Sequence, residues 1–145
     1  MFKITLITFH YIIYILQGGN NDFYENLGKV ECDVLLIFGK DDPWCKPAFA
    51  KRMFKSLNTR KGNNFVQRYI ELDNVGHCPN HEAPKSVGKL VQRWVSSDKK
   101  SENDLSLVHG KREFFQEQWG NISMYEIDKQ GAELSFLDNV FTRLV

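Results

Sequence analysis

The sequence predicts an α/β fold in which two parallel strands pack against helices. The first observation is a continuous apolar run over Val34–Phe38, which is typical of a strand buried on both faces of a parallel sheet. The second is a weaker strand pattern over Gln67–Leu72, and the third is a helical pattern that follows each of these strands. The order strand, helix, strand, helix favours parallel neighbours joined by a crossover.

The composition is that of one globular domain. The chain has 145 residues, of which 42% are hydrophobic and 26% are charged. This length supports a core of modest size. The formal net charge of +1 gives no electrostatic basis for binding nucleic acid, so we exclude nucleic acid as a partner.

The three cysteines are Cys32, Cys45 and Cys78, and they show no Cys-x-x-Cys spacing. An odd number without that spacing predicts no disulfide framework and favours a reducing compartment such as the cytoplasm. Each cysteine is predicted to act as a small buried apolar side chain.

Residues 1–27 form an apolar N-terminal segment followed by a polar linker. Residues 1–16 contain Lys3 as their sole charge, but they are shorter than the ~20 residues that span a membrane, and no small-residue cleavage site follows. A secretory signal or membrane anchor, an extraneous start and an extra strand at Ile4–Phe9 remain open. Membrane contact through residues 1–16 is the less favoured interpretation.

Residues 28–97 contain the predicted strands and helices, preceded by a short helix within Phe23–Val30. Pro47 is placed to open the first of the two main helices and Pro84 to open the second, with Gly88 weakening the second slightly. The first predicted inward stripe consists of Ala50, Met53, Phe54 and Leu57, and the second of Val87, Leu90, Val91, Trp94 and Val95.

Residues 98–145 form a C-terminal extension, predicted to be irregular but too apolar for a disordered tail. Within it, Ile122 and Met124 alternate as in a strand, and Phe136–Leu144 has helical character. We expect this extension to pack on the domain or on a partner.

Two motifs lie just after the two predicted strands. Gly39-Lys40-Asp41-Asp42-Pro43-Trp44 follows the first strand, and Gly76-His77-Cys78-Pro79-Asn80-His81-Glu82-Ala83-Pro84 follows the second. Open α/β proteins place their chemistry beyond the carboxyl ends of parallel strands, so both motifs fall where a site is expected.

These motifs resemble the C-terminal end of an α/β-hydrolase, over Lys29 to Val95. The resemblance implies a partial α/β-hydrolase fold that contains the last two core parallel strands, with Asp42 as the catalytic acid and His77 as the catalytic histidine. The Asp-Pro-Trp variant is most similar to plant, often plastid, hydrolases of the pheophytinase and chlorophyll dephytylase type. This resemblance implies a plastid as the location of the protein, as an alternative to the cytoplasm.

The chemistry of a catalytic triad explains why a carboxylate and an imidazole are needed. The carboxylate accepts the imidazole Nδ1 proton and leaves Nε2 to act as the base. Asp42 is otherwise an ordinary turn aspartate, and Asp41 is a competing carboxylate that we expect to face solvent. We expect Trp44 to form a wall of the core, with the wall of a substrate pocket as the alternative. We expect Glu82 to stabilise the N-terminus of the last core helix.

The nucleophile is the missing member of this set. A Gly-x-Ser-x-Gly elbow precedes the acid in α/β-hydrolases, but residues 1–41 contain no serine. Cys32 precedes Asp42, yet it lies at the opposite end of the strand. The segment that provides the oxyanion hole is absent too. The resemblance therefore implies a C-terminal fragment of a serine-type esterase, inactive alone, whose parent hydrolyses a small-molecule ester.

The alternative to an enzyme fragment is a non-catalytic interaction module derived from a hydrolase. The enzyme fragment, with two core strands, exposes a sheet edge that its parent covers, and so predicts poor stability alone or another chain over that edge. A zinc site is a weaker interpretation of His77, Cys78, His81 and Cys45, because Pro79 opposes the helix that would align the two histidines. We predict no metal and no cofactor.

Overall fold

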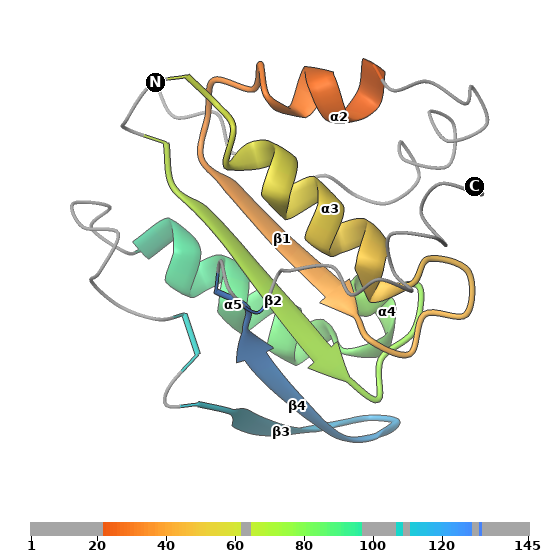
Figure 1. Cartoon of the computed structure of the whole chain (residues 1–145). Helices are drawn as coiled ribbons and strands as arrows, with labels where there is room; N and C mark the ends of the chain where they lie inside the picture. Colours follow the sequence, from red (N-terminus) through yellow and green to blue (C-terminus); the bar gives the residue numbers. More distant parts are fainter. Residues whose placement is uncertain (1–21, 62–64, 97–106, 109–110, 129–130, 132–145) are drawn as a thin grey trace.

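A computed structural model of the chain describes residues 22–61, 65–96, 107–108, 111–128 and 131 (Figure 1). The helices are α2 (Asp22–Leu27), α3 (Pro47–Leu57), α4 (Pro79–Glu82) and α5 (Pro84–Ser96), and the strands are β1 (Val34–Gly39), β2 (Gln67–Asp73), β3 (Glu113–Glu117) and β4 (Gly120–Glu126). The expectations for residues 1–16, including a strand at Ile4–Phe9, and for a helix at Phe136–Leu144 lie outside the described residues.

The predicted parallel strand pair is confirmed. β1 and β2 pair in parallel from Val34 opposite Gln67 to Gly39 opposite Leu72. The full sheet is mixed, with the strand order β1-β2-β4-β3. The α/β class is therefore confirmed at the level of a mixed four-stranded sheet with helices.

Helices cover both faces of the β1–β2 pair, as Figure 1 shows. On one face the predicted stripe of α3 is confirmed, because Ala50, Met53, Phe54 and Leu57 are all buried and belong to a core that includes Val34 and Tyr69. On the other face Leu90 and Trp94 of α5 are buried in a second core. Val95, predicted to face inward, is exposed, because adjacent helix positions point about 100° apart and Trp94 occupies the buried position in this last turn.

The C-terminal extension contains a β-hairpin, whereas the sequence predicted an irregular tail. β4 pairs antiparallel with β2, and β3 pairs antiparallel with β4. The alternation at Ile122 and Met124 was the local signal for this, and both side chains are buried in the core beneath α5. Gly120 has a φ of 140°, which side chains rarely tolerate, so glycine suits the turn. The hairpin covers the edge of β2.

The cysteines differ in exposure. Cys45 is buried as predicted and Cys32 is partly buried, but Cys78 is exposed and that expectation is wrong. Cys78 sits in the loop that leads into α4, at the rim of the sheet rather than under a helix. Among the described residues, no helix has the length and apolar character needed to cross a membrane.

Candidate functional site

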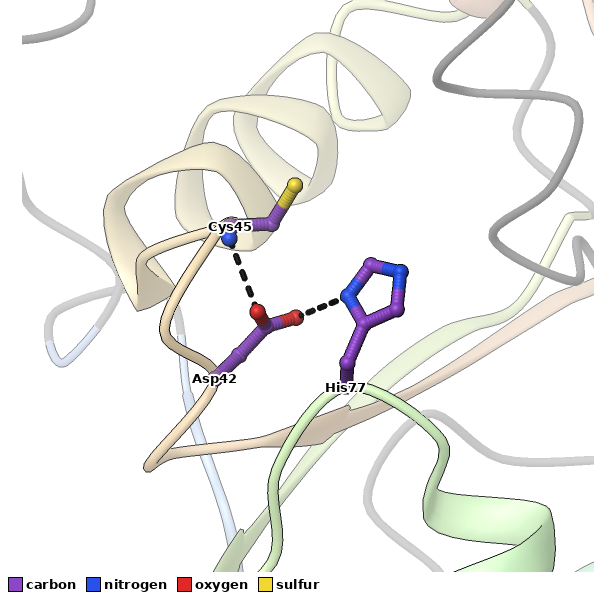
Figure 2. Close-up of side chains that lie close together, drawn as sticks. All are labelled: Asp42, Cys45 and His77. Carbon is purple, nitrogen blue, oxygen red and sulfur yellow. Dashed lines mark hydrogen bonds and ion pairs between the residues drawn. The ribbon is translucent and has the colours of Figure 1, made fainter.

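The loops after β1 and β2 bring Asp42 and His77 together. Nδ1 of His77 lies 2.8 Å from Oδ2 of Asp42, although the two residues are 35 positions apart in the sequence (Figure 2). The side chain of Asp42 is 3% exposed and that of His77 is 13% exposed. The two groups form a shielded contact at the carboxyl end of the parallel strands.

The backbone of the following turn orients the Asp42 carboxylate. Its Oδ1 atom accepts hydrogen bonds from the amides of Trp44 and Cys45, each at 2.8 Å. This Asx-type turn leads directly into α3, whose first residue is Pro47. With Oδ1 held by two amides, Oδ2 is directed at the imidazole of His77.

The tautomer of His77 follows from the chemistry of its partner. An ionised carboxylate has only acceptor atoms, so Nδ1 must donate the proton in the contact with Asp42. Figure 2 shows the second ring nitrogen of His77, Nε2, on the side of the ring away from Asp42. The arrangement can therefore take up a proton at Nε2 while Asp42 stabilises the resulting imidazolium.

The two loops approach each other closely because of Gly39. A Cβ atom at this position would lie within 2.5 Å of the Val75 carbonyl oxygen and would also overlap the carbonyl oxygen of Gly76. Only glycine permits this approach of the two backbones. The amide of Asp41 then donates to the carbonyl of Val75 at 3.0 Å, which fastens the first loop to the second.

The competing carboxylate, Asp41, has a different task. Its side chain is exposed, and Oδ2 accepts a hydrogen bond from the Asn74 amide at 2.9 Å. Asn74 has a φ of 61°, in the left-handed region that asparagine tolerates better than most residues. Asp41 thus fixes the turn after β2, and the structure places Asp42 rather than Asp41 against His77.

Glu82 also holds the loop that carries His77. Its two carboxylate oxygens accept hydrogen bonds from the amides on either side of His77, those of Gly76 at 2.7 Å and Cys78 at 2.9 Å. The expectation that Glu82 stabilises the N-terminus of the last helix is wrong, because its carboxylate binds these loop amides and not the first amides of α5. At that position the amide of Ser86 is bound by Glu117 from β3, a long-range contact for which the sequence offers no local signal.

Trp44 lies over the site and not in the core. Its side chain is 71% exposed, and its ring centroid is 4.7 Å from that of His77 in an edge-on arrangement. The expectation that Trp44 forms a core wall is wrong, because the turn around Asp42 directs residue 44 outward. The indole shields one side of the imidazole from water.

Cys45 is the third group close to the pair. One ligand atom from each of Asp42, Cys45 and His77 lies within 4.8 Å of the others, a spacing that a metal ion would require. Burial, followed by the negative charge of Asp42, raises the pKa of the Cys45 thiol to about 11. A metal needs the thiolate and would compete with the contact between Asp42 and His77. The arrangement suits proton transfer better than metal binding.

The other residues considered for zinc do not join this group. Among the described residues, Cys78 and His81 are exposed and lie outside the cluster of Asp42, Cys45 and His77. Cys32, the weak candidate for a nucleophile, precedes the start of β1 and so lies at the other end of the strand from Asp42. The absence of a metal and of a cofactor stays a prediction.

Comparisons with known proteins give a distant relative. No protein-family model matches the chain, and no solved structure matches it. Pheophytinase, chloroplastic, from Arabidopsis thaliana is 29% identical over 86 residues, which cover 57% of this chain. The chain spans only 16% of the length of that protein. The similarity supports a hydrolase-like resemblance over part of the sequence.

Proposed function

We propose that residues 28–97 are the C-terminal part of an α/β-hydrolase domain, in which Asp42 and His77 serve as the acid and the base of ester hydrolysis. The contact of 2.8 Å between His77 Nδ1 and Asp42 Oδ2 is the observation that carries the proposal. The distant similarity to pheophytinase supports it. The parallel order of β1 and β2, with one residue of the pair after each strand, also agrees with it.

In the proposed reaction, His77 and Asp42 act on a nucleophile that a longer parent protein supplies ahead of Asp42 in the chain. Nε2 of His77 accepts the proton of the nucleophile as the ester carbonyl is attacked, and Asp42 stabilises the imidazolium through Nδ1. His77 then returns the proton to the leaving alcohol. A water molecule, activated in the same way, releases the acid from the acyl-enzyme. The substrate of the parent protein is thus a small-molecule ester, and this chain alone would be inactive.

The first test is the transcript sequence upstream of Met1. An in-frame Gly-x-Ser-x-Gly elbow there supports the enzyme, because it would supply the nucleophile before the acid. A stop codon directly upstream, together with an expressed short message, would contradict an enzymatic role for this chain.

The second test uses the longer protein and measures kcat/KM on an activated ester. We expect Asp42→Asn to lower kcat, and with it kcat/KM, by roughly 10⁴-fold, because the histidine loses its correct tautomer. We expect His77→Ala to have an effect at least as large. Asp41→Asn and His81→Ala are matched controls, since both residues lie nearby and outside the contact. Equal losses in the control variants would refute the assignment of Asp42 and His77.

A second candidate function is a non-catalytic interaction module. The observation in its favour is that β1, within the described residues, pairs with β2 alone, so its other edge has no strand partner there. An edge strand is a template for a strand of another chain. Sedimentation of the purified 145-residue chain tests the module, because a monomer at all concentrations would contradict self-association through this edge.

A further inference from the structure

His77 stands on a loop and not on a regular element. β2 ends at Asp73 and α4 begins at Pro79, so the imidazole is carried by the segment between them. A side chain on a loop is held less exactly than one on a strand or helix, unless other groups fix the backbone that carries it. The contact of 2.8 Å between His77 Nδ1 and Asp42 Oδ2 therefore depends on what holds this segment.

Glu82 closes a ring of hydrogen bonds around the position of His77. Its Oε2 atom accepts the amide of Gly76 at 2.7 Å, and its Oε1 atom accepts the amide of Cys78 at 2.9 Å. In return, the amide of Glu82 donates to the carbonyl oxygen of Cys78 at 2.9 Å. Hydrogen bonds to an ionised group are stronger than those between neutral groups. One carboxylate thus binds the backbone on both sides of His77.

Gly76 leaves the space that this carboxylate occupies. A Cβ atom at position 76 would lie 3.2 Å from Oε2 and 3.3 Å from Oε1 of Glu82, which is tighter than ordinary van der Waals contact. Gly76 does not have a positive φ, so its backbone would accept a side chain without strain. An alanine here would press on the carboxylate, and Gly76→Ala therefore disturbs the same hydrogen bonds from the opposite side.

The orientation of the His77 ring decides which of its nitrogens carries the proton. The Asp42 carboxylate offers acceptor atoms alone, so it keeps the proton of a neutral imidazole on Nδ1. Without that partner, a neutral imidazole carries its proton on either nitrogen. A ring protonated at Nε2 cannot accept a further proton there and so cannot act as the base. A displaced loop would therefore appear as a changed tautomer of His77.

We propose that Glu82 is a positioning residue for His77. By binding the amides on both sides of His77, its carboxylate fixes the ring so that Nδ1 donates to Asp42 and Nε2 stays free. Glu82 acts through His77 and not on a substrate. The role of His77 as the base rests on the proposed function, whereas its tautomer is a property of this chain by itself.

The test is ¹⁵N NMR of the histidine side chains in the full 145-residue chain at about pH 8.5, well above the ordinary histidine pKa of about 6.5. The signals of His77 are those missing from His77→Ala, and the exposed His81 serves as an internal reference. We expect wild-type His77 to carry its proton mainly on Nδ1. Glu82→Ala should raise the fraction protonated at Nε2 at least about fivefold, and Asp42→Ala, which removes the acceptor, should raise it at least as much.

The matched control is Glu113→Gln, which removes a charged contact with Arg93 far from the loop. It should leave the tautomer of His77 unchanged, and a rise equal to that in Glu82→Ala would overturn the proposal. We expect Gly76→Ala and Glu82→Gln, which retains one acceptor oxygen, to raise the Nε2–H fraction about twofold. Wild-type fractions in a folded Glu82→Ala protein would overturn the proposal. If that variant does not fold, wild-type fractions in both milder variants would overturn it.

Kinetics of the longer protein separate this proposal from the proposed function. We expect Glu82→Ala to lower kcat about 30-fold and to change KM less than about twofold, because it misplaces the base without touching the substrate. An unchanged tautomer in Glu82→Ala, together with loss of esterase activity in Asp42→Asn, would refute the role of Glu82 alone. A changed tautomer in a longer protein without esterase activity would support the role of Glu82 and refute the proposed function.

Discussion

The parallel strands β1 and β2 and the antiparallel hairpin β3–β4 contribute to the same sheet in different ways. The parallel pair carries the candidate site, and the loops after its strands contain Asp42 and His77. The hairpin carries neither residue, but it supplies the edge pairing of β2 and the group that binds the first turn of α5. The site and its support therefore come from segments with different sequence signals.

The hairpin is joined to the rest of the domain by charged contacts over long sequence separations. Arg93 of α5 makes a two-pronged contact with Glu113 of β3, at 2.6 and 2.9 Å. At the end of β2, Asp73 accepts hydrogen bonds from Ser123 at 2.8 Å and from Arg112 at 2.6 Å. A bidentate pair between arginine and a carboxylate fixes orientation as well as distance. The comparison suggests that the hairpin braces the strand and helix that flank the site.

The substitution Gly39→Ala should have the largest effect on stability. It places a methyl group where the loop after β1 contacts the loop after β2. The added methyl group would meet backbone carbonyl oxygens of Val75 and Gly76, which cannot move aside as a flexible side chain can. We expect a loss of about 3 kcal/mol in the free energy of unfolding, measured by urea denaturation. A loss below about 1 kcal/mol would show that the loops are not held this closely.

The substitution Met124→Ala tests whether the hairpin is part of the cooperative domain. Met124 is fully buried, pairs with Leu72 of β2 and belongs to the core beneath α5. We expect a loss of about 2 to 3 kcal/mol with one unfolding transition that includes the β1–β2 pair. Phe114→Ala is the matched control on the same hairpin, because Phe114 is exposed and should change stability by less than about 0.5 kcal/mol.

Two separate unfolding transitions in Met124→Ala would contradict this view. They would mean that the hairpin unfolds while the parallel pair stays folded, so that it could not brace the site. Circular dichroism and the fluorescence of Trp94, which is buried in the same core, provide two probes of the transitions.

Asp73, at the end of β2, binds Arg112 and Ser123 near and in the hairpin. The stabilisation from these contacts should depend on pH. Burial raises its pKa, but hydrogen bonds from Lys40 and Ser123 and the charges of Lys40 and Arg112 outweigh burial and lower the pKa below its ordinary value of 3.8. A lowered pKa in the folded state means that the unfolded state binds the proton more readily. The stabilisation is therefore present above about pH 4 and is lost as the pH falls through the folded-state pKa.

We expect Asp73→Asn to lower the free energy of unfolding by about 1 kcal/mol at pH 7 and by less at pH 3. The measurement is urea denaturation of both proteins at several pH values between 3 and 7. The exposed Glu31→Gln variant controls for the loss of one negative charge. If the free energies of unfolding of wild type and Asp73→Asn differ by the same amount at every pH, an ionic link between β2 and the hairpin through Asp73 would be contradicted.

The parallel half was largely predictable because its signals are local. An apolar run marks β1, prolines at positions 47 and 84 mark the starts of α3 and α5, and the residue types after each strand suggested Asp42 and His77. The hairpin was predictable only from the alternation of Ile122 and Met124. The pairing of β4 with β2 joins residues that are 50 to 56 positions apart, from Asp73 opposite Ser123 to Ile70 opposite Glu126. The contact from Glu117 to Ser86 joins residues 31 positions apart, and such long-range contacts leave no periodic pattern.

The orientations of Trp44 and Glu82 were mispredicted for a different reason, because the contacts that set them are short-range. Apolar character favoured a buried Trp44, but the two amide hydrogen bonds to Asp42 set the direction of the turn and place the indole outside. Position near a helix start favoured a capping role for Glu82, but the amides beside His77 are within reach and bind it instead. In both cases hydrogen bonds between a side chain and backbone amides at most six positions away decided the orientation, and not apolar character or position near a helix start.

The smallest expected effect is a gain in stability from Gly88→Ala, which serves as the counterpart of Gly39→Ala. Gly88 lies inside α5, and a Cβ atom there would meet nothing within 4 Å. The helix propensity of alanine then acts without a steric penalty, so we expect a gain of about 0.5 to 1 kcal/mol in urea denaturation. The same substitution should thus have opposite signs at two glycines, because one permits contact between two backbones and the other faces open space. A loss of stability at Gly88 would contradict the open surroundings of this position.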